Sequence, residues 1–318
     1  MSYLRYVLRR AAFAVLSVYA VVTATYFLGT LTIRDQIENI LALEQYSGAS
    51  ERELELLEEA LVERYGLDRP ILDQLLNWWV DVTTLDWGES ISFREPIVAV
   101  LDGRVQTTLE YVIPGVILAM VLGVFLGLFA ALAKDGVFDY SVRLISYAVL
   151  GIPVFMLLFY MMYLEGWKIR LVGGWVLVLA EVDSMTLATV AVALGLLAGQ
   201  IRFARASSLE QTGRSFVKML RAKGAGRIRL ARHVLRNAAI PIISLSITEL
   251  LAVLVLNIYV IEEVLRIRGL ADVSLQAATQ ADVPLLIWST MVVVALGITA
   301  SFIQDVLYGY LDPRIRTG

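Results

Sequence analysis

The sequence predicts an all-α integral membrane protein with six transmembrane helices, an external helical insert between the first and second, and a cytoplasmic helical segment between the fourth and fifth. Two observations support this fold class. The 318 residues are 58% hydrophobic and 18% charged, whereas soluble chains average about 45–50% apolar and about 25% charged residues. The apolar residues also gather in long uncharged runs, and a helix needs about 20 such residues to cross a bilayer. This composition excludes a disordered chain and a nucleic-acid-binding arm.

Five uncharged runs, and a sixth with one charge, are long enough or nearly long enough to span a membrane. In chain order they are Ala11–Ile33, Tyr111–Ala133, Leu144–Leu164, Ser184–Ile201, Ala238–Ile261 and Val283–Gln304. Backbone polar groups in lipid must be paired within their own segment, so each run is predicted to be helical. The first run is long for a signal peptide and lacks a small-residue cleavage site, so we expect it to remain as the first span.

The distribution of charge predicts the orientation, because cytoplasmic connections are enriched in Lys and Arg. The segment Arg202–Arg236 has ten basic residues and one acidic residue, whereas Arg34–Gln106 has six basic and sixteen acidic residues. We therefore place both termini and the basic segment in the cytoplasm, and the acidic segment outside. The predicted parts are the N-terminus and first span (1–33), an external helical cap (34–106) and a five-span core (107–318).

The external segment contains residues that typically start and end helices, and they predict two helices. Ser50 followed by Glu53 is a capping-box pattern, and Gly66 is placed to end the first helix. Pro70 predicts the first turn of a second helix, which contains Trp78 and Trp79. Trp-rich amphipathic helices suit a membrane interface or a partner groove. Two interpretations stay open: a small cap packed on its own bundle, or a docking surface for an external partner.

The basic segment between the fourth and fifth spans, residues 202–237, contains apolar positions at helical spacing. They predict two short helices broken at Gly224-Ala-Gly226. The positive charge fits a simple cytoplasmic bias, binding to anionic lipid, or docking of a cytoplasmic protein. The glycine break favours a shaped element.

Several residue types that support catalysis or cofactor binding are missing. The chain has no cysteine and a single histidine, His233, and it contains no Gly-x-x-x-x-Gly-Lys-Ser/Thr pattern. We therefore expect no metal site, no catalytic site and no bound ATP in this chain.

Three features inside the spans stand out. Ala119, Gly123, Gly127 and Ala131 recur every four residues and predict close helix approach. Pro153, with Gly151, is the candidate flexible point of the third span. Glu249 is the one charge inside a predicted span, and Asn257 follows eight residues later on one helical face. These two side chains either line a polar path or form interhelical hydrogen bonds that fix packing.

Short motifs along nearly the whole chain resemble one family. They are Tyr6-Val-Leu-Arg-Arg10, Tyr65-Gly-Leu-Asp-Arg-Pro70, Asp86-Trp-Gly-Glu-Ser90, Arg104 with Thr107-Thr-Leu109, Gly151-Ile-Pro-Val-Phe155, Arg221-Ala-Lys-Gly224, Arg232-His-Val-Leu-Arg-Asn237 with Ile240-Pro241, Ala281-Asp-Val-Pro284 and Leu311-Asp-Pro-Arg-Ile-Arg316. Their order and spacing resemble the inner-membrane permease subunit of binding-protein-dependent ABC importers, in the dipeptide, oligopeptide and nickel branch.

The resemblance implies a function and an assembly. It implies a non-enzymatic permease in a prokaryotic cell membrane that forms half of a path for short peptides. The implied partners are a second related permease, two cytoplasmic ATPase subunits that hold ATP and Mg, an external solute-binding protein and the lipid bilayer, with no nucleic acid. Nickel or oligosaccharides are alternative substrates, and an ATP-independent carrier or channel is the alternative of a different class.

The resemblance also implies site residues. The coupling helix that contacts the ATPase would be about Arg214–Gly226, with Phe216, Ala222, Lys223 and Gly224 as contacts. Independently of the resemblance, Glu249 and Asn257 are the candidate path residues, and Gly151 and Pro153 the candidate hinge. The family motif begins Glu-Ala-Ala, but about Lys218-Met-Leu220 stands here, without the acid. Before the last span, Glu263 is followed by Arg268-Gly-Leu-Ala271 in place of a Pro-Gly-Leu-Gly turn, so we expect a remodelled loop.

Overall fold

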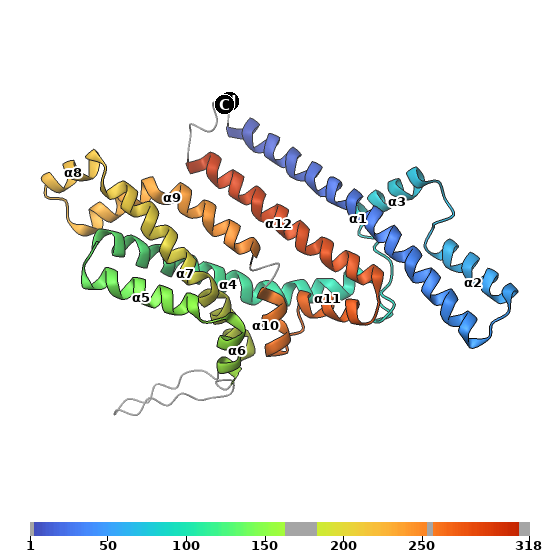
Figure 1. Cartoon of the computed structure of the whole chain (residues 1–318). Helices are drawn as coiled ribbons and strands as arrows, with labels where there is room; N and C mark the ends of the chain where they lie inside the picture. The colour runs from blue at the N-terminus through green and yellow to red at the C-terminus, as the bar shows by residue number, and fades with distance from the viewer. Residues whose placement is uncertain (1–2, 163–182, 253–256, 312–318) are drawn as a thin grey trace. The chain divides into compact units, whose positions relative to one another are not determined.

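The computed structural model describes residues 3–162, 183–252 and 257–311. The helices are α1 (Tyr3–Ser47), α2 (Glu51–Arg64), α3 (Ile71–Thr84), α4 (Ile97–Leu132), α5 (Val137–Gly151), α6 (Val154–Met162), α7 (Ser184–Thr212), α8 (Ser215–Ala222), α9 (Arg227–Ala252), α10 (Ile258–Leu265), α11 (Leu270–Thr279) and α12 (Val283–Leu311) (Figure 1). Within the described residues, the only extended pairing is an isolated bridge between Glu89 and Pro96. The all-α prediction is confirmed for this part of the chain.

Four of the described helices are long and apolar enough to cross a membrane: α1, α4, α7 and α12. They contain the predicted first, fourth and sixth spans, and the second except for its last residue, Ala133. The predicted third span is divided between α5 and α6, and residues 163–164 lie outside the described residues. The predicted fifth span is divided between α9 and α10, with residues 253–256 outside the described residues.

Some helices run well past the predicted span ends. The 45 residues of α1 correspond to about 68 Å, more than twice the thickness of a bilayer core. In the basic segment, the prediction of two short helices is correct for α8 and wrong for the second helix. There α9 begins at Arg227 and continues through Ala252, so the basic residues and the start of the predicted fifth span form one helix.

The boundaries of the helices between residues 50 and 84 follow the predicted signals. The backbone N–H of Ser50 donates to Glu53 Oε2 at 2.8 Å, and both halves of the capping box are present. Gly66 has a φ of +63°, in the left-handed region that favours glycine after a helix. Pro70 is the N-cap of α3 and so stands one position before the predicted first turn.

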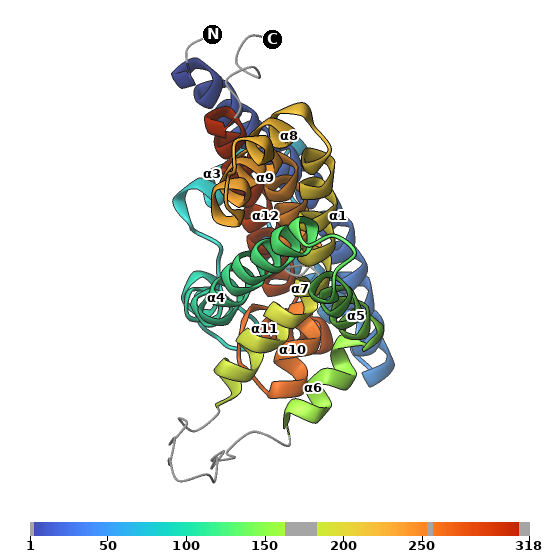
Figure 2. The same ribbon diagram turned by 90° about the vertical axis from the view of Figure 1, so that its left-hand side faces the viewer.

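By its contacts the chain divides into two compact units: Met1–Arg10 with Arg104–Asp272 and Thr299–Gly318, and Ala11–Gly103 with Val273–Ile298. In the first unit, α7 lies alongside both α5 and α9 (Figures 1 and 2). Its core includes the fully buried side chains Tyr111, Leu158, Ile258 and Ile261. In the second unit, the indole of Trp288 stacks between Trp78 and Trp87, with ring centroids 4.6 and 4.7 Å apart.

The predicted stripe of small residues on α4 faces α7. A Cβ built on Gly127 would lie 2.6 Å from the Ile201 carbonyl oxygen and 2.7 Å from Ala204 Cβ, and one on Gly123 would overlap Gln200 Cβ. Both distances are too short for any real side chain. The two glycines therefore allow the backbones of α4 and α7 to touch, as small residues do in membrane interfaces.

Replacing Gly127 by alanine should lower the thermal unfolding temperature of the chain in detergent, because the new methyl group must push α7 away. Overpacking of this kind costs about 1–3 kcal/mol. Gly103→Ala on the same helix is the matched control, since nothing lies within 4 Å of its added Cβ. Equal unfolding temperatures for the two variants would contradict the close approach.

Candidate functional site

A buried carboxylate organises the turn between α10 and α11. Glu262 is 1% exposed. Its Oε1 accepts hydrogen bonds from Thr108 Oγ1 at 2.6 Å and Tyr111 Oη at 2.9 Å, and its Oε2 accepts one from the backbone N–H of Asp272 at 2.8 Å. A buried charge is tolerated only when such donors replace its water. Glu262 therefore fixes α10 and the start of α11 against α4.

The same turn requires glycine at position 269, and a second hydrogen bond ties it to Thr108 of α4. A Cβ on Gly269 would overlap the Glu262 carboxylate and lie 2.6 Å from Thr108 Oγ1, so only glycine fits. The hydroxyl of Thr108 also accepts from the backbone N–H of Leu270 at 2.8 Å. Arg104 Nη1 lies 3.0 Å from Asp272 Oδ2. Motif residues far apart in the sequence thus converge on one turn.

The structure corrects the residue assigned to this turn. The prediction took Glu263 as the acid that precedes it, but Glu263 is exposed and the adjacent Glu262 is the buried one. The signal that separates them is helical phase, because Ile258, Ile261 and Leu265 are also buried and share a face of α10 with Glu262. The turn itself contains Arg266 at a φ of +52°.

A second buried carboxylate joins two further motifs. Asp282 is fully buried and accepts hydrogen bonds from Ser90 Oγ at 2.6 Å, Ser92 N at 2.9 Å and Ser92 Oγ at 2.7 Å. Its Oδ1 accepts from Leu285 N at 3.2 Å, at the start of α12. Burial alone would raise the pKa of Asp282, but these hydrogen bonds outweigh burial and hold the pKa below its ordinary value. The carboxylate therefore anchors the loop before α4 to the first turn of α12.

A third carboxylate, missed in the sequence, joins α5 to α7. Asp139 is fully buried, and Arg205 holds it in a bidentate pair at 2.6 and 2.8 Å. The backbone N–H of Asp135 adds a bond of 3.1 Å. The hydrogen bonds from Arg205 hold the pKa of Asp139 below its ordinary value. No local pattern announces this pair, because its members lie 66 residues apart.

The predicted coupling helix is α8, which joins the neighbouring ends of α7 and α9 (Figure 1). Val217 is fully buried in a cluster with Leu128 and Val234, and Phe216 packs partly against it. On the other side, Ala222, Lys223 and Gly224 are exposed, and Met219 is 52% exposed. One face of α8 is thus fixed to the helices beneath it, and the other is open.

Glycine at position 224 is required by the backbone. Gly224 has a φ of +72° just after the end of α8, and the N–H of Ala225 bonds back to the Leu220 carbonyl at 3.0 Å. This pattern ends a helix through a left-handed residue. It sets the direction in which the chain leaves α8 for α9.

The remaining predicted site residues lie at helix breaks or outside the described side chains. Gly151 ends α5, and Pro153 stands between α5 and α6. Asn257 is the N-cap of α10. Glu249 lies in α9, but its side chain is outside the described residues. The described residues contain no group of three His, Cys, Asp or Glu side chains that could hold a metal ion.

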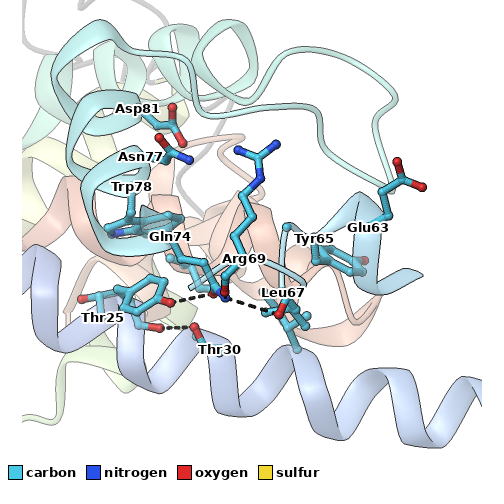
Figure 3. A pocket seen from close by; sticks show the side chains of 15 residues that line it. Thr25, Thr30, Glu63, Tyr65, Leu67, Arg69, Gln74, Asn77, Trp78 and Asp81 are labelled. Atoms are coloured by element: carbon cyan, nitrogen blue, oxygen red, sulfur yellow. Dashed lines mark hydrogen bonds between the residues drawn. The ribbon is translucent and has the colours of Figure 1, made fainter. Parts of the chain in front are cut away.

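A cavity of about 310 Å³ lies between α1, α3 and the loop before α3 (Figure 3). Its floor is fixed, since Tyr26 Oη donates to Gln74 Oε1 at 2.7 Å and Gln74 Nε2 donates to the Arg69 carbonyl at 2.6 Å. Arg69 rises between Asp81 on α3 and Glu63 (Figure 3). Burial raises the pKa of Asp81, and the negative charge of Asp86 raises it further. The cavity thus combines a rigid aromatic floor with a charged rim.

Replacing Glu262 by alanine should destabilise the chain by roughly 3 kcal/mol, because Thr108, Tyr111 and a backbone N–H lose their buried acceptor. Thermal unfolding in detergent measures the effect. Glu263→Ala is the matched control, and as an exposed change it should stay within about 0.5 kcal/mol. Similar losses for both variants would show that Glu262 is not the organising residue.

The Asp139–Arg205 pair should make stability depend on pH. The pKa of Asp139 is lower in the folded chain than in the unfolded chain, so its contribution is present above the unfolded value and is lost as the pH falls through the folded value. At pH 7, Asp139→Asn should be less stable than the native chain by roughly 2 kcal/mol. The difference should shrink as the pH falls below about 4. Urea unfolding at several pH values checks it, and a difference that stays constant would refute it.

Comparison with known proteins identifies the family. A family model described as the binding-protein-dependent transport system inner membrane component matches residues 123–317, more than half of the chain. The dipeptide transport system permease protein DppB of Bacillus subtilis is 28% identical over 266 residues, which cover 82% of this chain and 85% of that protein. The oligopeptide transport system permease protein AppB of the same organism is 27% identical over 268 residues, covering 81% and 84%. The metal-staphylopine import system permease protein CntB of Staphylococcus aureus is 26% identical over 319 residues, covering 99% of each chain. The chain therefore belongs to the family of binding-protein-dependent transport system inner membrane components.

Proposed function

We propose that the chain is the permease subunit of an ATP-driven ABC importer and forms half of a path for short peptides. The family match over residues 123–317 is the observation that carries this proposal, and it includes α8 with its open basic face. The other components are a second related permease, two cytoplasmic ATPase subunits with ATP and Mg, and an external solute-binding protein. In this proposal the chain itself has no catalytic residue and no cofactor.

The proposed topology has six spans with both termini and α8 in the cytoplasm of a prokaryotic cell. The four long apolar helices support four of these spans. For the third span we propose α5 with α6, interrupted at residues 152–153, and for the fifth span α9 with α10. The division into residues 1–33, 34–106 and 107–318 follows from this topology.

The proposed coupling works through α8. Because Val217 and Phe216 fasten one face to α4 and α9, a force applied to the open face is transmitted to those helices. A short rigid helix of this kind can convert closure of two ATPase subunits into tilting of the spans. Phe216 serves in the fastening, whereas Ala222, Lys223 and Gly224 lie where an ATPase groove can reach them.

The transport path and its hinge are also proposals. The break between α5 and α6 at Pro153, beside Gly151, supports a bending point, since proline cannot donate the helical hydrogen bond. Glu249 and Asn257 are proposed to line the path. Glu249 lies in α9, and Asn257 immediately precedes α10.

For the external segment, the sequence leaves two interpretations open: a cap packed on its own bundle, and a docking surface for an external partner. Each fits a different helix. Trp78 Nε1 donates to the Val22 carbonyl and Trp79 Nε1 to Thr23 Oγ1, both at 3.1 Å, so α3 packs on α1 as a cap. The polar face of α2 is strongly acidic and exposed. We propose that this acidic face receives the solute-binding protein.

Short peptides are the favoured substrate because two of the similar proteins are named for dipeptide and oligopeptide transport. Nickel and oligosaccharides are alternatives within the same class, and the name of a third relative refers to metal-staphylopine import. An ATP-independent carrier or channel is the alternative of a different class, and the family match argues against it.

Reconstitution of the complete complex in proteoliposomes tests the function. We expect uptake of labelled di- and oligopeptides that requires ATP, both ATPase subunits and the solute-binding protein. Nickel or oligosaccharide uptake without peptide uptake would move the chain to another substrate. Uptake by this chain alone, without ATP, would contradict an ABC permease.

Reversing one charge on the open face of α8 should weaken ATPase attachment. Lys223→Glu is expected to reduce the amount of ATPase that co-purifies with the tagged chain by about tenfold. The positive charge at the interface is lost, and the new negative charge repels any acidic group of the ATPase that faced the lysine. Arg52→Glu on the external helix α2 is the control with the same charge change. Equal ATPase recovery from both variants would count against α8 as the contact.

A further inference from the structure

A basic cavity lies between α5 and α7, next to the Asp139–Arg205 pair. It has a volume of about 240 Å³ and is lined by Arg143, Ser146, Tyr147, Ile201, Arg202 and Arg205. Three of the six lining residues are arginine, and none is acidic. A water molecule occupies about 30 Å³, so the space also admits a phosphate group.

The positive charge of the cavity is not balanced by its surroundings. Asp139 neutralises Arg205 through the bidentate pair, and it lies 3.8 Å from Arg143 Nε. That Nε is buried and has no hydrogen-bond partner. Asp135 also acts on Arg205 through space. Even with both acids counted, the three arginines are in excess, so the cavity favours an anion.

In the predicted topology, Arg143 and Arg202 lie at the same depth in the membrane. Arg143 directly precedes the predicted third span, and Arg202 directly follows the predicted fourth span. In the predicted topology both places are cytoplasmic ends of spans, and α5 packs along α7. Lipid phosphates lie at this level, and basic pockets between helices on the cytoplasmic side suit anionic headgroups.

The surface beyond the arginines is apolar and uncovered by the chain. On α5, Tyr147 is 61% exposed and Leu150 is 54% exposed. They follow Arg143 by four and seven residues, so helical spacing places them on its face, one and two turns toward the membrane centre. This order, with cations first, then an aromatic ring, then an aliphatic side chain, matches a lipid from its phosphate to its acyl chains.

We propose that this cavity binds the phosphate headgroup of an anionic phospholipid of the cytoplasmic leaflet, with the acyl chains along Tyr147 and Leu150 of α5. The bound headgroup bridges Arg143 of α5 and Arg202 of α7, and so reinforces the link that Asp139 and Arg205 make between the same two helices. The proposal depends on the orientation of the chain and not on its transport substrate.

The test measures lipid binding to the full-length chain in detergent, by native mass spectrometry and by thermal unfolding. Phosphatidylglycerol should bind and raise the unfolding temperature, whereas phosphatidylcholine should not. The double variant Arg143→Gln, Arg202→Gln should bind phosphatidylglycerol about 25-fold more weakly, since each arginine contributes about fivefold. Arg9→Gln, which removes an exposed arginine ahead of the first span, is the matched control and should bind like the native chain.

Each other outcome would overturn the proposal. Equal stabilisation by inorganic phosphate and phosphatidylglycerol would assign the cavity to a soluble anion. Equal binding by the double variant and Arg9→Gln would place the lipid elsewhere. Loss of ATPase co-purification with unchanged lipid binding would assign the arginines to a protein partner. If the double variant does not fold, photoactivatable phosphatidylglycerol on the native chain decides, because cross-links that miss α5 and α7 would refute the site.

Discussion

A bilayer offers no water to a buried polar group, and the structure depends on how the chain meets that constraint. Three carboxylates are buried among the described residues: Asp139, Glu262 and Asp282. Each accepts several hydrogen bonds, and each joins segments that are far apart in the sequence. All three stand near the ends of the apolar helices, where the chain turns. Between these points, small residues let the helices touch, as Gly123 and Gly127 do between α4 and α7.

Hydropathy and local signals predict much of the fold. The long apolar runs predict the positions of α1, α4, α7 and α12, and the pattern from Ser50 to Gly66 predicts α2 almost to the residue. Such predictions succeed because the cause lies within a few neighbouring residues. The divided third span is a different case. An uncharged run does not show where a helix stops and restarts inside it.

The candidate sites are harder to predict because their partners are distant in the sequence. Glu262 and Glu263 look alike in a motif, and only the phase of α10 decides which is buried. The pair of Asp139 and Arg205 has no local signature at all. The family resemblance supplied Arg104, Thr108, Gly269 and Asp282, and the structure adds a physical reason for each. Thr108 and Gly269 meet at the Glu262 carboxylate, and Arg104 pairs with Asp272. Asp282 accepts hydrogen bonds from Ser90 and Ser92. The motifs therefore mark contacts that hold the fold together.

In the proposed assembly, α8 contacts the ATPase subunits in the cytoplasm. The absence of cysteine from the sequence makes single-cysteine cross-linking the most direct measurement. In membranes that contain the ATPase subunits, a cysteine at Lys223 should cross-link to an ATPase, and it should resist a membrane-impermeant thiol reagent applied from outside. A cysteine at Arg52 should not cross-link to an ATPase, and it should react with the same reagent applied from outside. Labelling of position 223 from the outside, or cross-linking of the ATPase to position 52, would contradict the account.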